Sequence, residues 1–303
     1  MRNIIEYKNL IWVDIIKPTK GDIRYLQQEF KLHPLSLKNI IPSIRHPDFD
    51  IFHDYISIIL HYPRNEEGGD VEIHELDIIV GKNYLITNHY TSIRPLNSLL
   101  KKCIKSEELK EEYMGKGSGH LLVFILNKFL KRILEKTDKI SEDLYSAEKE
   151  IFVGEELEMV KKIAYLKRRI ISFWRATEPQ GEVFYSLKAI GPTFFGQEYR
   201  HYFSDLFRIY KRIDNSLRTY KETIKSLEET NHSMVNLKRN EIIKILTIFS
   251  VILMPLTLLA SVWGMNTNFL PFNKSVFDFW LIVGLMLIIS SGMLLYFRMK
   301  KWL

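Results

Sequence analysis

The sequence predicts an α+β membrane protein in which a mixed N-terminal domain leads through one long helix into a two-helix membrane hairpin. Two uncharged apolar runs, Ile245–Trp263 and Phe279–Phe297, close the 303-residue chain. Each run is close to the roughly 20 residues that cross a bilayer as a helix. The residues before these runs are densely charged, whereas a single carboxylate follows Glu241. No Pro or Gly interrupts the chain between Gln197 and Pro255, as expected for one long helix.

Residues 1–115 are expected to form a mixed α/β domain on the cytoplasmic side. Runs rich in β-branched and aromatic residues, separated by turn residues, predict strands. Helical spacing predicts a helix over 20–30, and His33-Pro34 is expected to start a shorter one. The predicted strands cover 10–16, 54–62, 75–81 and 82–90, with Glu66–Gly69 as the turn between the second and third.

Residues 116–196 are expected to form an antiparallel pair of long helices. Lys116–Gly119 reads as the linker into this region, and a highly charged helical pattern runs from His120 to about Thr177. Val153-Gly154 is a weak point in that pattern, where one helix would end and the next begin.

Residues 197–263 predict a stalk helix that runs into the first membrane span, at about 243–263. Unbroken, it would extend about 100 Å at 1.5 Å per residue. A two-stranded coiled coil would explain its heptad seam equally well, but not why the seam enters the bilayer without a break. The seam consists of Leu206, Tyr210, Ile213, Leu217, Tyr220, Ile224 and Leu227.

The two spans are expected to form a hairpin with both chain ends in the cytoplasm of the cell. The predicted parts are a loop at 264–276, a second span at 277–297 and a basic tail at 298–303. Lys and Arg residues flank the spans on the chain-end side, whereas the loop offers only Lys274. The positive-inside rule then places the loop outside and the protein in the plasma or inner membrane. The N-terminus has no apolar core or cleavage site typical of a signal peptide.

Composition argues against several other classes of protein. The net charge of +7 does not require nucleic acid, because Lys and Arg beside the membrane interact with anionic lipid. Cys103 is the only cysteine, so no intrachain disulfide forms. The segment at 115–120, GKGSGH, lacks the spacing of a phosphate-binding loop, and no zinc-ligand spacing occurs. We therefore expect neither an enzyme nor a bound cofactor.

The end of the chain closely resembles the CorA family of magnesium transporters. Three features show the resemblance: the segment 240–266, the tripeptide Gly264-Met265-Asn266 after the first span, and the ending YFRMKKWL. His33-Pro34-Leu35 is also similar to the family pattern. The resemblance implies a CorA-like funnel, a homopentamer with five long helices around a pore, and passive influx of Mg²⁺, often also of Co²⁺ or Ni²⁺.

The resemblance also implies which residues line the pore. Most of these positions step by three and four, so they share one helix face independently of the family. Contacts between membrane helices are the alternative explanation for the Ser and Thr residues among them. The implied pore-lining residues are Asn240, Ile243, Leu246 or Thr247, Ser250, Met254, Thr257 and Ser261, with Gly264, Met265 and Asn266 as the selectivity filter.

An amide ring suits a magnesium pore for a physical reason. Mg²⁺ releases water reluctantly, so a ring of Asn266 oxygens that binds the ion through its hydration shell can select it without stripping it. Gly264 would permit the turn that leaves the helix. Met254 and Ile243 would form apolar rings that close the path by dewetting.

Two departures from the family pattern limit the comparison. The outer loop lacks the acidic residue that relatives carry after Met-Pro, so cation recruitment would depend on its Asn residues or on Asp278. The stalk acid of the family's cytoplasmic Mg²⁺ site matches Asp205, but its partner position is Asn39, beside Lys38. We therefore expect a weakened regulatory site.

Two other functions are consistent with the sequence. One is a Zn²⁺, Co²⁺ or Ni²⁺ transporter on the same scaffold, against which Met265 argues mildly. The other is a membrane-tethered sensor or scaffold that conducts nothing, in which the stalk only holds copies of the chain together.

Overall fold

The computed structural model describes residues 2–40, 45–65, 71–152, 156–265 and 276–302. The chain divides into two compact units, Met1–Glu228 and Glu229–Leu303. The turn predicted at Glu66–Gly69, the weak point at Val153-Gly154 and most of the predicted loop 264–276 lie outside the described residues.

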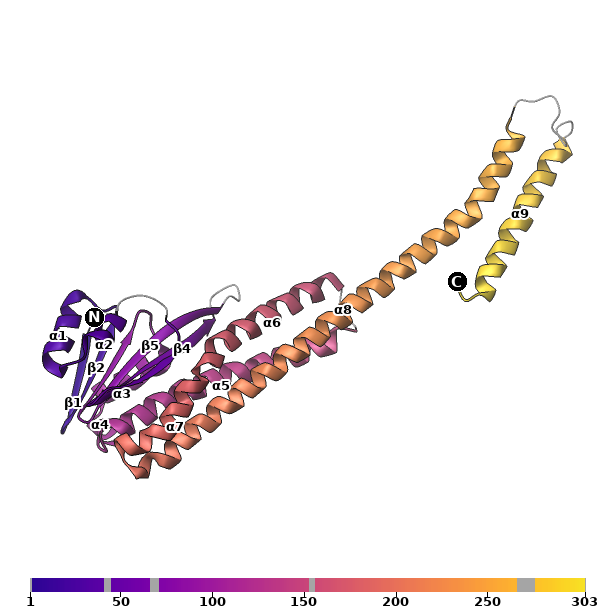
Figure 1. The fold of residues 1–303 in the computed structure, drawn as a ribbon. Coiled ribbons are helices and arrows are strands. Elements are labelled where there is room, and N and C mark those ends of the chain that lie inside the picture. Colours follow the sequence, from indigo (N-terminus) through magenta and orange to yellow (C-terminus); the bar gives the residue numbers. More distant parts are fainter. Residues whose placement is uncertain (1, 41–44, 66–70, 153–155, 266–275, 303) are drawn as a thin grey trace. The chain divides into compact units, whose positions relative to one another are not determined.

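The first unit contains a six-stranded mixed sheet in the order β1-β2-β6-β5-β4-β3 (Figure 1). Only the β2–β6 pair within it is parallel; the other neighbours are antiparallel. The prediction of strand 10–16 is confirmed by β2. The strands are β1 (Arg2–Tyr7), β2 (Leu10–Ile16), β3 (Asp48–Ile51), β4 (Tyr55–Asn65), β5 (Val71–Gly81) and β6 (Tyr84–His89).

Side chains of the four central strands enter two different cores, because successive residues point to opposite faces of a sheet. In β2, Leu10 and Trp12 face the larger core, whereas Val13 and Ile15 face the smaller one. Helices α3 to α8 supply the rest of the larger core. The smaller core is closed by α1 (Lys20–Phe30) and α2 (Pro34–Asn39).

Both short helices begin where local side chains satisfy their first backbone groups. Thr19 and Asp22 form a capping box at the start of α1, whose bounds match the predicted helix. At α2, His33 Nδ1 accepts a hydrogen bond from the Leu35 amide at 3.2 Å. The His33 amide in turn donates to the Tyr55 hydroxyl at 3.0 Å, which fixes the start of α2 to β4.

Four elements of this unit were not predicted from the sequence. Strands β1 and β3 are short edge strands, and α3 (Arg94–Lys105) and α4 (Glu107–Met114) are short helices. Ser106 both ends α3 and caps α4, where its hydroxyl accepts from the Leu109 amide at 3.3 Å. The two helices therefore form one tight corner against the sheet.

Three helices occupy the region where a helix pair was expected. They are α5 (Ser118–Glu150), α6 (Glu156–Thr177) and α7 (Gly181–Phe195), with a 3₁₀ turn at Glu178–Gln180 between the last two. The linker predicted at Lys116–Gly119 is shorter in the structure, because α5 already begins at Ser118. Gly191 lies against the Phe203 ring, which is 2.5 Å from where a Cβ would stand, so α7 packs closely on the next helix.

The long helix α8 (Arg200–Trp263) follows a 3₁₀ turn at Gln197–Tyr199 and continues through Pro255. Its heptad seam is buried within the first unit from Leu206 to Leu227, in the same core as α5, α6 and α7. A second chain is not needed to cover this part of the seam. The coiled-coil interpretation is therefore wrong over these residues.

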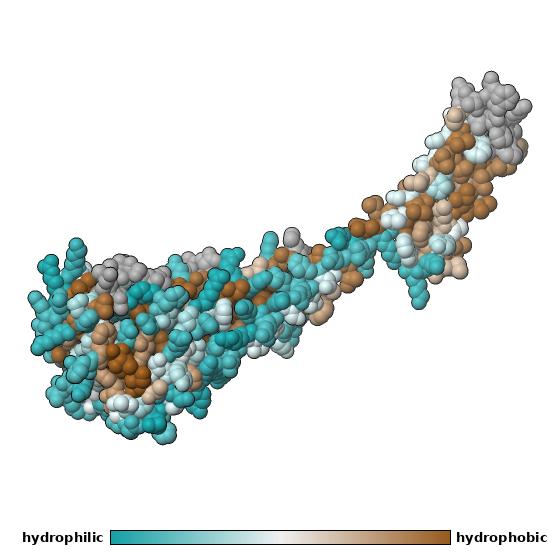
Figure 2. All heavy atoms as spheres, in the orientation of Figure 1, coloured by the Kyte–Doolittle hydropathy of each residue, from teal (hydrophilic) through white to brown (hydrophobic). Residues whose placement is uncertain are grey.

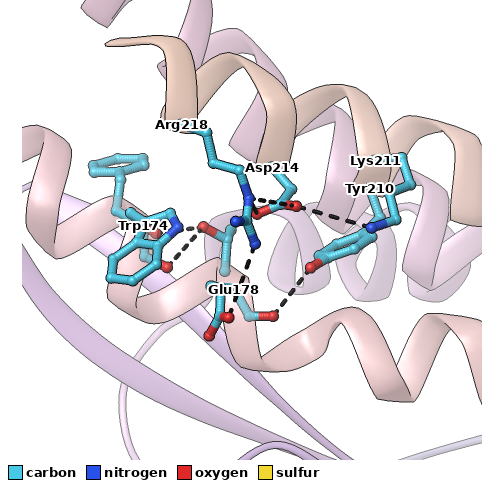
Figure 3. A network of polar contacts seen from close by, with 8 residues as sticks. Trp174, Glu178, Tyr210, Lys211, Asp214 and Arg218 are labelled. Carbon is cyan, nitrogen blue, oxygen red and sulfur yellow. Dashed lines mark hydrogen bonds and ion pairs between the residues drawn. The ribbon is translucent and has the colours of Figure 1, made fainter. Parts of the chain in front are cut away.

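A polar network fixes the first part of α8 to the turn after α6 (Figure 3). Asp214 is almost fully buried and accepts from Arg218 Nε at 3.2 and 3.3 Å. The Tyr210 hydroxyl donates to the Glu178 carbonyl at 3.0 Å, and Arg218 also lies 3.9 Å from the Glu178 carboxylate. Two neighbouring elements are thus held by ionic and hydrogen bonds as well as by the apolar seam.

The second unit contains the rest of α8 and α9 (Val276–Met299). Both helices are long and apolar enough to cross a membrane. Large apolar side chains are exposed on both, and Figure 2 shows these helices as mainly hydrophobic. Exposed apolar surface of this extent fits a lipid environment. The fold class predicted from the sequence is confirmed.

Candidate ion path on the first membrane span

The end of α8 has one side covered by α9 and one side left open. Lys244 Nζ donates to the Lys301 carbonyl at 3.3 Å, so the two helices lie side by side in this unit (Figure 1). The less exposed positions in this part of α8 mark the covered side: Lys244, Ile248, Ile252, Pro255, Leu256, Leu259 and Trp263. This spacing repeats at about 3.6 residues per turn, as one helix face does.

The predicted pore-lining residues lie on the opposite side of α8. At about 100° per residue, the centre of their stripe is roughly 200° from the centre of the α9-covered side. All are exposed in the single chain, Met254 to 71%. Thr247 lies nearer the centre of this stripe than Leu246 does. The polar stripe, as we call it below, consists of Asn240, Ile243, Thr247, Ser250, Met254, Thr257 and Ser261.

Three hydroxyl groups of the polar stripe, those of Thr247, Ser250 and Thr257, donate to their own helix. Thr247 Oγ1 donates to the Ile243 carbonyl at 2.8 Å, and Ser250 Oγ to the Leu246 carbonyl at 2.9 Å. Thr257 Oγ1 bonds the Leu253 and Met254 carbonyls at 3.1 and 2.9 Å. With the proton directed at the backbone, each oxygen keeps lone pairs that can accept from water. The stripe can therefore bind the water shell of a cation without carrying charge.

Gly264 stands at the end of α8, where its amide donates to the Ala260 carbonyl at 2.9 Å. A Cβ at this position would lie 2.9 Å from the same carbonyl oxygen. That contact is too short for an ordinary side chain, so the turn favours glycine. Met265 follows with its side chain 57% exposed, and Asn266 lies outside the described residues.

Asp205, the predicted regulatory acid, has a partner in its own helix. Its half-buried carboxylate forms an ion pair with Arg208, three residues further along α8. The side chains of Lys38 and Asn39 lie outside the described part of the chain. Among the described residues, no group of three or more His, Cys, Asp or Glu side chains could hold a metal ion.

A second polar cluster lies on the face of the sheet that α1 and α2 cover, and sequence reasoning missed it. Arg45 Nη2 lies 3.4 Å from Asp77 and 3.6 Å from Glu75, and Asn88 Nδ2 donates to Asp77 at 2.8 Å. Burial, followed by the negative charge of Glu75, raises the pKa of Asp77 to about 8. The only sequence signal is a pair of acids inside the strand run of β5.

Comparison with known proteins assigns nearly the whole chain to one protein family. The family model described as "CorA-like Mg2+ transporter protein" matches residues 7–301. The cobalt/magnesium transport protein CorA of Thermotoga maritima is 26% identical over 296 residues, 96% of this chain and 83% of that protein. The protein of the same name from Methanocaldococcus jannaschii is also 26% identical, over 97% of this chain and 92% of its own length.

Solved structures agree with the sequence comparison. The complete structure of the CorA magnesium transporter from Methanocaldococcus jannaschii superposes with a TM-score of 0.82 at 25% identity, over 99% of this chain and 94% of that one. Full-length CmaX shares the fold, with a TM-score of 0.77 at 17% identity over 97% and 89% of the two chains. The chain thus belongs to the CorA-like Mg²⁺ transporter family, a family of membrane transporters for divalent cations and not of enzymes.

Proposed function

We propose that five copies of this chain form a channel in the plasma or inner membrane for passive uptake of hydrated divalent cations. Mg²⁺ is the first choice among these ions. Both chain termini would lie in the cytoplasm, and no cofactor would be needed. The observation that carries the proposal is the polar stripe on the side of α8 that α9 leaves open. Five such stripes around one axis would line a hydrated path.

The chemistry of the stripe suits a strongly hydrated ion. Neutral hydroxyl and amide oxygens accept hydrogen bonds from coordinated water, and they do not hold the cation so tightly that it cannot leave. The exposed side chains of Ile243 and Met254 interrupt the stripe with apolar rings. Such rings would gate the path by dewetting.

The membrane potential supplies enough energy for uptake. Moving one charge through 100 mV is worth about 2.3 kcal/mol, so a divalent ion gains about 4.6 kcal/mol. Nucleotide hydrolysis is therefore not required.

Uptake of Mg²⁺ into proteoliposomes that hold a defined membrane potential tests this function. We expect uptake well above that of empty liposomes, and its near loss in Asn266→Ala while assembly is unchanged. Asn215→Ala, at an exposed position of α8 in the first unit, is the matched control and should transport normally. Parallel measurements with Co²⁺, Ni²⁺ and Zn²⁺ rank the ions. If the protein is a non-conducting scaffold, the wild type and both variants will show no uptake above that of empty liposomes.

We also propose that cytoplasmic Mg²⁺ closes this channel poorly. Arg208 already neutralises Asp205, and the position expected to pair with Asp205 across subunits is Asn39 rather than an acid. A neutral oxygen beside a cation is a weak Mg²⁺ ligand. Influx measured while Mg²⁺ inside the vesicles is raised through the millimolar range should change little; strong closure in that range would refute the proposal.

A further inference from the structure

Among the residues that the structure describes, four cationic side chains and no acidic one line a groove on the surface of the first unit. It encloses about 550 Å³ between α3 and α4. Residues Arg94, Asn97, Ser98, Lys101, Lys102 and Lys105 line it from one face of α3, with Ser92 before the helix and Leu109 from α4. The volume falls in the range of small-molecule sites, about 300–1,000 Å³.

The four cations of this groove have no carboxylate partner among the described residues. Within the residues that the structure describes, no carboxylate lies within 4.0 Å of the charged groups of Arg94, Lys101, Lys102 or Lys105. Two of the four acids of α4 are paired, Glu107 with Lys110 and Glu111 with Lys8, and none of the four lines the groove. The groove therefore concentrates uncompensated positive charge.

The positive field extends from the groove toward α5. Burial, followed by the positive charges of Arg132 and Arg94, lowers the pKa of Lys136 to about 8. Lys136 is held in place by a hydrogen bond to the Pro63 carbonyl at 2.7 Å. Arg94 thus contributes to the groove and to the field at a neighbouring helix.

The arrangement of the groove favours a chain of phosphates over a single anion. From Arg94 to Lys105 the cations extend over about 17 Å of helix at 1.5 Å per residue, so one phosphate cannot reach them all. Hydroxyl and amide groups of Ser92, Asn97 and Ser98 add polar partners between the cations. The described part of the chain contributes no aromatic side chain to the groove, and single-stranded nucleic acids depend on stacking of their bases on such rings.

We propose that the α3–α4 groove binds a soluble polyphosphate anion, either inorganic triphosphate or the triphosphate of a nucleotide. The Mg²⁺-free form is the preferred ligand, because a bound Mg²⁺ neutralises the same oxygens that the lysines would contact. Occupancy would then fall as Mg²⁺ rises. Binding is independent of ion conduction, so it can be tested even if the transport proposal fails.

Titration calorimetry of the full-length protein in neutral detergent tests the groove. Triphosphate and ATP, each with EDTA, should bind with similar affinity, and excess Mg²⁺ or 0.5 M salt should weaken both. In the double variant Lys101→Gln/Lys105→Gln we expect affinity to fall about tenfold, because charge-assisted hydrogen bonds are the strong ones.

The matched control is Lys20→Gln/Arg24→Gln, which removes the same charge from exposed positions of α1 and should bind like the wild type. Gel filtration and tryptophan fluorescence verify that both variants fold and assemble. Equal weakening in both variants would overturn the proposal as a general charge effect. It would also be overturned if neither polyphosphate bound, or if only an oligonucleotide or anionic vesicles bound through the same lysines.

Discussion

Gly264 is the residue at which the smallest change should have the largest effect on the ion path. An added methyl group would lie 2.9 Å from the Ala260 carbonyl oxygen, at the end of the helix that positions Asn266. Relief of that contact requires the backbone to shift, at a cost of about 1–3 kcal/mol. The proposed filter begins at this residue, so we expect the shift to impair it.

We therefore predict that Gly264→Ala lowers Mg²⁺ uptake by at least about tenfold without loss of assembly, which a shift of about 1.4 kcal/mol would already produce. Uptake into proteoliposomes measures the effect. Gly284→Ala is the control, because a Cβ there meets no atom within 4 Å. Equal transport by the two variants would show that the turn at Gly264 has room for a side chain.

Asp77 gives the first unit a pH-dependent stability. The pKa of its carboxyl is raised from 3.8 to about 8, so between these values the folded state holds a proton that the unfolded state has lost. The free energy of unfolding then decreases as the pH rises. The contribution of Asp77 to the free energy of unfolding is complete below about pH 4 and is lost as the pH rises through about 8.

We predict that Asp77→Asn flattens this dependence, since an amide stays neutral and can still accept from Asn88. Thermal unfolding of the full-length protein in detergent, followed by tryptophan fluorescence at pH 5 and pH 8.5, provides the measurement. The wild type should lose more stability between the two pH values than the variant does. Asp54→Asn, with an 81% exposed side chain, should behave as the wild type; an identical slope in all three proteins would contradict the assignment.

Among the elements, α8 depends on both apolar and ionic contacts in the first unit. Asp214 is the buried member of its polar network, with only 3% of the side chain exposed. We predict that Asp214→Asn destabilises the protein by about 1–3 kcal/mol, because Arg218 loses a charged partner. Asp205→Asn, whose pair is half-exposed, should cost less than about 1 kcal/mol. Thermal midpoints in detergent compare the two, and a larger loss for Asp205→Asn would reverse the ranking.

The sequence predicted the elements that have strong periodicity or composition. Strand 10–16, helix 20–30, the unbroken α8 and the two spans follow from such patterns. Strands β1 and β3 were missed because they are short edge strands whose partners are set by the tertiary fold. The partner of the heptad seam was also not predictable, because periodicity shows which face is apolar but not what covers it.

The polar stripe could be predicted from the sequence in part, whereas the α3–α4 groove could not. Steps of three and four along the chain place Ser250 and Thr257 on one helix face, and the fold adds that α9 leaves this face open. The groove needs the corner between α3 and α4, which the sequence did not predict. Without that corner, its lysines cannot be told in the sequence from those of an ordinary solvated helix face.

For the whole molecule, the central claim is that several copies of α8 enclose water along the polar stripe. A single cysteine introduced on the stripe should then react with a charged, water-soluble thiol reagent in the assembled protein. Native Cys103 can remain, because it is fully buried and burial raises the pKa of its thiol to about 11, which leaves little reactive thiolate.

The most direct measurement is the labelling rate of Ser250→Cys compared with Ile252→Cys in the reconstituted protein, together with Mg²⁺ uptake after labelling. Ile252 lies on the side of α8 that α9 covers. We predict rapid labelling at Ser250→Cys with loss of uptake, and slow labelling without loss at Ile252→Cys. Rapid labelling at Ile252→Cys with an inert Ser250→Cys would place the stripe against lipid and contradict a water-filled path along α8.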